Sequence, residues 1–270
     1  KTKFINRFLM NNINDKLLDN YAKRILVDYD NKTPGTIFKE NIKITIPQAW
    51  EIQSKVARLR EVRGEKIVGY KIGCTPKSGN QNRIGISHPA WGRLWENEQH
   101  KNGEILEKGN YRNPSMEAEF GIILSRDLNK NKFSFEYLQN LIETVHPIIE
   151  IHNLVFHGKP PHGPELLANN AIHAGVVFGK AVKNLIWDAK TDLNLIYDGQ
   201  IVDSWEDKKW SQDMFSDIEW LLNELSKINK YLKKGDLILI GAFGPPIPIE
   251  ENKFIEVKSS LIGEVNAKFI

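Results

Sequence analysis

Residues 116–128 read MEAEFGIILSRDL, and two glutamates, Glu117 and Glu119, stand near the head of this otherwise apolar run. The run alternates and then becomes continuously apolar, as a largely buried strand does. Residues two apart on a strand face the same side, so the two glutamates project together and the apolar residues around them face the other way. Two ionised carboxylates side by side near a core repel each other. The pattern therefore predicts either a shared proton or a bound cation.

A third carboxylate favours the cation. Glu150 lies in another apolar, β-rich run, HPIIEIHN, and a helix fits between the two runs, so that their strands could be neighbours. Three carboxylates on rigid strands suit a hard divalent ion such as Mg²⁺, and Mn²⁺ is chemically close to it. The competing interpretation is that Glu117 and Glu119 are solvated on a half-exposed strand face.

The remaining pattern indicates a mixed fold. Helical spacing of apolar residues predicts helices over residues 14–29, 45–64, 133–146 and 215–235. The expected caps are Asn14 or Asp15, then Thr45, and a capping box of Ser216 and Glu219; Gly64 and Gly235 would end their helices.

Short β-type runs are expected over residues 68–74, 147–156, 171–179 and 236–249. Two alternating runs flank Asp198-Gly199, a pair typical of two-residue hairpins, and residues 253–270 read as a final hairpin. Because helices and strands do not alternate regularly, we expect an α+β fold. Its parts would be an N-terminal helical region, residues 1–66, and a mixed β-sheet catalytic domain, residues 67–270, which together form one compact unit.

The composition argues against several classes of protein. A chain of 270 residues with 41% apolar residues can bury a large core. Its net charge is only +3 and its lysines are scattered, so we expect no nucleic-acid partner. No apolar run approaches the ~20 residues of a membrane span. The single cysteine, Cys74, excludes an internal disulfide and fits a reducing compartment, so we expect a cytoplasmic protein without a membrane partner.

Four blocks, in this order and spacing, resemble the 2-keto-4-pentenoate hydratase and 4-oxalocrotonate decarboxylase family of the fumarylacetoacetate hydrolase superfamily. They are GYKIGCT, MEAEFGIILSRDL, HPIIEIHN and GDLILIGAFGPPIPI, and the similarity spans roughly residues 65–250. The resemblance implies a rolled, mixed β-sheet behind N-terminal helices. It also implies a Mg²⁺ or Mn²⁺ site formed by Glu117, Glu119 and Glu150, and a site lysine at Lys71.

The implied chemistry is physically consistent. A 2-keto acid can chelate a metal through its carboxylate and keto oxygens, and the metal then stabilises an enolate as a Lewis acid. Lys71 would neutralise the substrate carboxylate or assist proton transfer. Thr75 would hydrogen-bond the substrate or simply shape a turn.

We therefore expect a metal-dependent lyase that acts on a small 2-keto acid, first of all a hydratase of a 2-hydroxy-dienoate or 2-keto-enoate, working as a homo-oligomer. A decarboxylase, tautomerase or C–C hydrolase of the same superfamily is the alternative within enzymes. A catalytically degenerate partner subunit is the alternative outside them.

The substrate end departs from the family pattern. The family block Asp-x-Pro-Asp-aromatic-Gly reads SHPAWG here, with Ser87 and Ala90 in the acidic positions. The block Ala-Asp-Asn-Ala-Ser becomes ANNAIH, in which Asn169 replaces the aspartate and His173 follows. A Gly-His/Asn-Pro block before the late helix is absent. These changes weaken the prediction that the usual dienoate is hydrated.

Histidines are concentrated between residues 146 and 173. Five of the seven lie within 28 residues: His146, His152, His157, His162 and His173. Their spacing fits no familiar zinc motif, and solvated loop histidines are one interpretation. The alternative is that His88 or His173 replaces a lost acid–base group, since histidine titrates near neutral pH. Residues 157–165, HGKPPHGPE, would then be a lid-like loop over the site or a proline-stiffened connector.

Overall fold

The computed structural model of the chain describes residues 2–33, 35–76, 79–130, 132–157, 159–211, 213–240, 244–251 and 253–270, with only the backbone before Asn14. Residues 241–243 of the block GDLILIGAFGPPIPI and Gly158 of the histidine-rich loop therefore lie outside the described residues.

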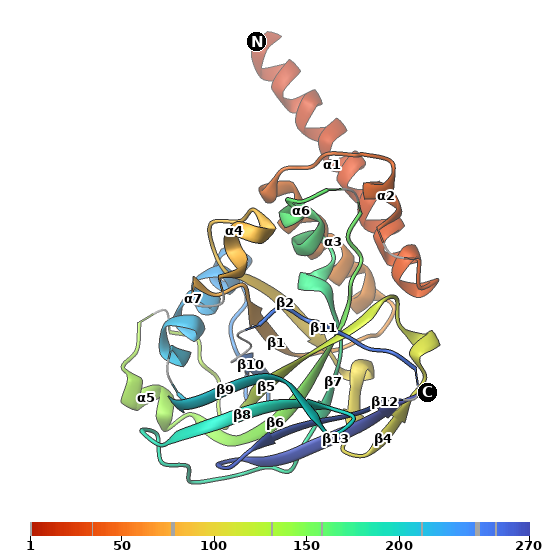
Figure 1. The fold of residues 1–270 in the computed structure, drawn as a ribbon. Helices are drawn as coiled ribbons and strands as arrows, with labels where there is room; N and C mark the ends of the chain where they lie inside the picture. The colour runs from red at the N-terminus through yellow and green to blue at the C-terminus, as the bar shows by residue number, and fades with distance from the viewer. Residues whose placement is uncertain are drawn as a thin grey trace.

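The larger of two β-sheets carries the family blocks (Figure 1). Its strands are β1 (Ile67–Gly73), β2 (Ala90–Trp95), β3 (Gln99–Lys101), β5 (Pro114–Leu124), β6 (Ile142–Asn153), β7 (His173–Phe178), β10 (Leu237–Ile240) and β11 (Ile247–Pro248). They lie in the order β2-β1-β10-β5-β6-β7-β3, and β11 pairs with β5. The pairs β1–β10 and β3–β7 are parallel and the others are antiparallel, so the sheet is mixed.

The second sheet has five strands in the order β4-β13-β12-β8-β9. These are β4 (Glu104–Leu106), β8 (Lys190–Tyr197), β9 (Gln200–Lys209), β12 (Lys253–Ser259) and β13 (Gly263–Phe269). The two expected hairpins are confirmed as β8–β9 and β12–β13. Asp198 and Gly199 both have positive φ, 47° and 79°, as a hairpin turn with a right-handed strand twist requires.

The two sheets pack face to face over the main apolar core. From β5 this core receives every second residue: Met116, Ala118, Phe120, Ile122 and Leu124. Leu195 and Val257 contribute from the second sheet. Glu117 and Glu119 consequently point to the other face of β5, as the alternation predicts.

The helices are α1 (Thr2–Asp30), α2 (Thr36–Lys39), α3 (Ile46–Val62), α4 (Asn80–Ile84), α5 (Phe135–Gln139), α6 (Gly163–Ala168) and α7 (Met214–Lys227), and the 3₁₀ turns are η2 (Glu96–Glu98), η3 (Lys108–Asn110) and η4 (Asn170–Ile172). Helices α1, α2, α3 and α6 gather at one end of the sheets and share a second apolar core, to which Ala22, Ile52 and Leu167 belong (Figure 1). Among the described residues, no helix combines the length and apolar character needed to span a membrane.

The start and end of α3 agree with the sequence. Thr45 Oγ1 accepts a hydrogen bond from the Gln48 amide at 3.4 Å, and Gln48 Oε1 accepts one from the Thr45 amide at 2.8 Å, which completes a capping box. Gly64 follows the helix with a φ of 97°. The sequence predicts both helix ends correctly because each depends only on residues within four positions of it.

Two other helix boundaries are corrected. Helix α1 begins at Thr2, so Asn14 and Asp15 lie inside it and do not cap it. Asp15 instead pairs with Lys55 of α3 at 2.5 Å. Helix α7 begins at Met214 after Asp213 and ends at Lys227. The Ser216 hydroxyl donates to the Asp213 carbonyl at 2.8 Å, so the expected capping box is wrong.

The helix expected over residues 133–146 is also largely wrong. Only α5 is helical, and the chain enters β6 at Ile142. Residues 142–146 pair with β5, with Val145 opposite Ile122. The β-branched side chains of Ile142, Thr144 and Val145 suit a strand. Pairing with β5 therefore overrides the weak helical periodicity.

Candidate metal and substrate site

The carboxylates lie together on one face of two paired strands. Glu117 of β5 is directly opposite Glu150 of β6, and Glu119 is opposite Ile148. Glu150 is 0% exposed and Glu119 is 1% exposed, whereas Glu117 is half-buried. Like charges directly opposite in a sheet destabilise it. The arrangement therefore needs positive charge close by.

Lys71 of β1 supplies part of that charge. Its Nζ lies 3.5 Å from Glu150 Oε1, and both side chains are buried. Burial works to lower the pKa of Lys71, but the charges of Glu150, Glu117 and Glu119 outweigh it, so this pKa is raised. Burial likewise works to raise the pKa of Glu150, but Lys71, His152 and His173 hold it well below its usual value. The pair is thus an ammonium facing a carboxylate.

His152 completes the cluster and was missed from the sequence as a site residue. It follows Glu150 by two residues on β6 and so faces the same side. Its Nε2 lies 2.9 Å from Glu117 Oε2 and 3.6 Å from Glu150 Oε2. Because an ionised carboxylate only accepts hydrogen bonds, this Nε2 donates to Glu117. The even spacing from Glu150 was the signal that could have identified it.

The donor set fits a divalent cation. One ligand atom each from Glu117, Glu150 and His152 lie within 4.8 Å of one another. Within the described part of the chain, Glu150 Oε2 has no hydrogen-bond partner although it is buried. Oxygen donors with one imidazole suit Mn²⁺ well and are compatible with Mg²⁺, and a metal would displace the His152 proton. Glu119 shares the face but lies outside this cluster of three.

His173 lies behind the carboxylates. It opens β7, its side chain is buried, and its Nδ1 donates to Glu150 Oε1 at 2.8 Å. Its Nε2 faces Glu98 Oε2 at 3.6 Å. Glu98 Oε1 accepts hydrogen bonds from the Tyr29 hydroxyl and, at 2.6 Å, from Arg60. A chain of polar contacts therefore connects α1 and α3 to Glu150.

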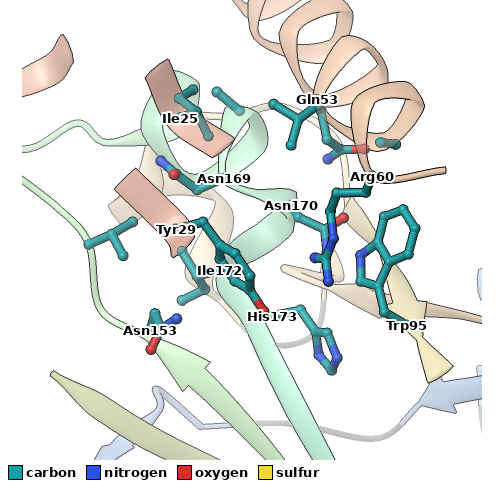
Figure 2. A pocket seen from close by; sticks show the side chains of 14 residues that line it. Ile25, Tyr29, Gln53, Arg60, Trp95, Asn153, Asn169, Asn170, Ile172 and His173 are labelled. Carbon is teal, nitrogen blue, oxygen red and sulfur yellow. The ribbon is translucent and has the colours of Figure 1, made fainter. Parts of the chain in front are cut away.

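This chain of contacts borders a small cavity of about 40 Å³. Figure 2 shows Tyr29, Arg60, Asn170 and His173 around it, with the Trp95 ring beside the Arg60 guanidinium. Such a volume holds about one to a few water molecules and is too small for a substrate. His173 lines this small cavity and is not among the residues that line the larger cavity described below.

The segment ANNAIH places His173 through an unusual turn. Asn170, Ala171 and Ile172 all have positive φ, between 50° and 59°. The Asn170 side chain accepts from the Arg93 amide at 2.7 Å and donates to the Arg93 carbonyl at 2.8 Å. The Asn170 side chain thereby bonds both backbone groups of Arg93, as a neighbouring strand would. These two hydrogen bonds hold the strained turn in place.

A larger cavity of about 360 Å³ lies on the open side of the cluster. Lys71, Glu117 and His152 line its polar end, and Arg83 of α4 lines it as well. Pro160 and His162 also line it, so the expected lid-like loop does border the site. Ala90, in one of the family's acidic positions, contributes only a methyl group to the wall.

Two expected site residues lie elsewhere. Thr75 is half-buried in the turn after β1 and is not among the residues that line the large cavity. The His88 ring lies 6.0 Å from the Trp50 ring, and its Nδ1 contacts the Pro89 carbonyl at 2.8 Å. The structure therefore brings together Lys71, Glu117 and Glu150, with His173 behind them, but not His88 or Thr75.

No family model matches the chain. It is 26% identical over 223 residues to the TodF product hydratase of Pseudomonas putida strain F1, which covers 82% of this chain and 83% of that one. It is 25% identical over 236 residues to the 2-oxo-hept-4-ene-1,7-dioate hydratase of Escherichia coli, with 84% and 88% covered.

Solved structures share the fold. The 4-oxalocrotonate decarboxylase from Pseudomonas putida G7, complexed with magnesium and adipate, aligns with a TM-score of 0.82 at 20% identity, over 95% of this chain and 98% of that one. The fumarylpyruvate hydrolase from Pseudomonas aeruginosa, in complex with Mn²⁺ and pyruvate, aligns with a TM-score of 0.57 at 12% identity, over 74% and 88%.

The similar proteins and the two curled, mixed sheets indicate the same fold. The expected α+β fold of the fumarylacetoacetate hydrolase type is confirmed. The resemblance carried by the four sequence blocks is confirmed too: this chain is a relative of the 2-keto-4-pentenoate hydratases and has the fold of the fumarylacetoacetate hydrolase superfamily.

Proposed function

We propose that this protein is a Mg²⁺- or Mn²⁺-dependent lyase that hydrates a small 2-keto-enoate or its 2-hydroxy-dienoate tautomer. The observation that carries the proposal is the pair of the half-buried Glu117 and the buried Glu150, with His152 and Lys71 beside it at one end of the large cavity. The hydratase names of the sequence relatives and the metals in the structural neighbours support it.

Glu117, Glu119 and Glu150 would hold the metal, with His152 as a further donor. When bound, the ion supplies a Lewis acid for the carboxylate and keto oxygens of the substrate. Lys71 lies 3.5 Å from Glu150, and its carboxylate neighbours raise its pKa, so it would act as a positive charge for the substrate carboxylate or assist proton transfer. His173 donates a hydrogen bond to Glu150 Oε1 from behind, and much of the cavity wall is apolar.

Decarboxylation is the second candidate, and Ala90 favours it. Decarboxylation uses the same electron sink but needs no activated water, and Ala90 removes a carboxylate from the cavity wall where the family carries one. Incubation with 2-hydroxypenta-2,4-dienoate and, separately, with 4-oxalocrotonate distinguishes the two. Loss of the dienoate absorbance with a hydrated product in the NMR spectrum supports the hydratase. Release of CO₂ only from 4-oxalocrotonate supports the decarboxylase.

Metal binding provides an independent test. Mg²⁺ or Mn²⁺ should raise the melting temperature by mass action, and oxalate or pyruvate should raise it further in the presence of the metal. An unchanged melting temperature with both metals would contradict the metal-enzyme proposal. A metal-dependent shift without turnover of any 2-keto acid would favour a degenerate partner subunit.

We infer further that the enzyme acts on its small substrate as a cytoplasmic homo-oligomer, and that residues 1–66 and 67–270 fold as one unit. The second apolar core supports a single unit because it joins Ala22 of α1 and Ile52 of α3 to Leu167 of α6. Sedimentation of the whole chain gives the oligomeric state, and a single unfolding transition is expected for one cooperative unit.

A further inference from the structure

Among the described residues, each Lys, Glu and His side chain that lines the large cavity has a hydrogen-bond or ion-pair partner. Lys71 pairs with Glu150 at 3.5 Å, His152 with Glu117 at 2.9 Å, and the cavity-lining His162 with Glu165 at 3.1 Å. Within the described part of the chain, the Arg83 guanidinium makes no ion pair or hydrogen bond. Arg83 is an exposed residue that lines the cavity, and among the described lining residues it is the charged one without a partner.

The charge of Arg83 acts inside the cavity. Cys74 lines the same cavity, and burial raises the pKa of its thiol, while the positive charges of Lys71 and Arg83 both pull that pKa back. Lys71 and Arg83 thus both lie close enough to Cys74 for their charges to act on it. Lys71 belongs to the carboxylate cluster, whereas Arg83 comes from α4.

Contacts with three segments hold α4 at this place. Gln81 Nε2 donates to the Cys74 carbonyl at 2.8 Å, and Asn80 Nδ2 donates to the Gly244 carbonyl at 3.4 Å. Gly85 ends the helix with a φ of 80°, and a Cβ there would lie 2.4 Å from Pro161 Cβ. Since α4 is tied to the turn after β1, to the segment after β10 and to the histidine-rich loop, Arg83 is presented from a fixed element.

The remainder of the wall is largely apolar. Ile84, Leu154, Phe156, Leu166 and Ile172 are among its lining residues. A ligand in this cavity would therefore meet a metal-binding cluster with an ammonium, an apolar wall and an unpaired guanidinium. A volume of about 360 Å³ lies at the small end of ligand pockets and suits a short-chain acid.

We propose that Arg83 binds a second carboxylate of the substrate, so that this enzyme acts on a 2-keto dicarboxylic acid and not on a 2-keto monocarboxylic acid. The inference rests on the proposed function, which places the 2-keto acid group at the Lys71 end. A guanidinium binds a carboxylate through two parallel hydrogen bonds, which makes Arg83 the residue that selects the substrate class.

Two saturated probes that differ only at the far end test this inference. 2-Oxoadipate carries a carboxylate where 2-oxohexanoate carries a methyl group. Calorimetry with Mg²⁺ or Mn²⁺ present should show that the wild-type protein binds 2-oxoadipate at least about tenfold more tightly than 2-oxohexanoate. Arg83→Met should weaken 2-oxoadipate binding by about 10- to 100-fold, as expected for hydrogen bonds between charged groups. It should leave 2-oxohexanoate binding within about twofold.

The control is Arg58→Met, which removes an exposed arginine on α3 that does not line the cavity. It should change neither affinity, and circular dichroism verifies the fold of both variants. If both probes bind and Arg83→Met leaves the preference unchanged, the Arg83 subsite is wrong while the proposed function stands. If neither probe binds the wild-type protein with either metal, the proposed function is wrong, and so is the Arg83 subsite that rests on it.

Discussion

The contacts between the N-terminal helices and the carboxylates make Arg60 the most informative residue to remove. Its guanidinium is buried, lies 2.6 Å from Glu98 and 2.5 Å from Glu65, and stacks over the Trp95 ring at 4.0 Å. In Arg60→Met, methionine fills much of the space of the aliphatic stem but leaves Glu98, only 5% exposed, without its cation.

The expected loss follows from these contacts. Removing one partner of a buried ion pair destabilises a protein by about 3–5 kcal/mol, because the remaining charge is uncompensated. Loss of the contact with Trp95 adds roughly 0.5–2 kcal/mol. We expect the free energy of unfolding to fall by about 4–7 kcal/mol, which corresponds to a melting temperature lower by about 8–28 °C for a chain of this size.

Urea unfolding at pH 7, followed by tryptophan fluorescence, measures the effect. Adding Glu98→Gln removes the uncompensated charge, so the double variant should recover at least about 1 kcal/mol relative to Arg60→Met. A loss below about 1 kcal/mol for Arg60→Met, or strictly additive effects in the double variant, would refute the view that a buried ion network holds the helices to the site.

Three further predictions concern the carboxylates and pH. Glu119→Gln should weaken Mn²⁺ binding as measured by electron paramagnetic resonance, and an unchanged affinity would remove Glu119 from the metal set. His173→Ala should lower the Mn²⁺ affinity by about 10- to 100-fold in a folded protein, because Glu150 loses the donor that orients it; an effect below twofold would contradict this positioning role. Burial raises the pKa of Asp236 from 3.8 to about 6, so stability should decline as pH rises from about 4 to about 6. Asp236→Asn should abolish this slope and add about 2–3 kcal/mol at pH 7 in urea titrations, whereas a stability loss at pH 7 would disprove the argument.

The sequence alone determined features that depend on near neighbours. The alternation around Glu117 and Glu119 assigned both glutamates to one face of a strand, because the side-chain period of a strand is two whatever the partner. The same holds for the Thr45 cap and for the Asp198-Gly199 turn, where a few adjacent residues satisfy the local geometry. The shared face of the two glutamates is therefore a property of the local sequence.

Only the tertiary structure decided what surrounds these glutamates. Residues 142–146 became a strand because β5 offered a partner, which no local pattern records. The structure brings His152 to Glu117 and His173 between Glu150 and Glu98, whereas His88, equally plausible from sequence, contacts Trp50. These placements depend on strand order and register, and register is set by the packing of whole sheets, which joins residues far apart in the chain.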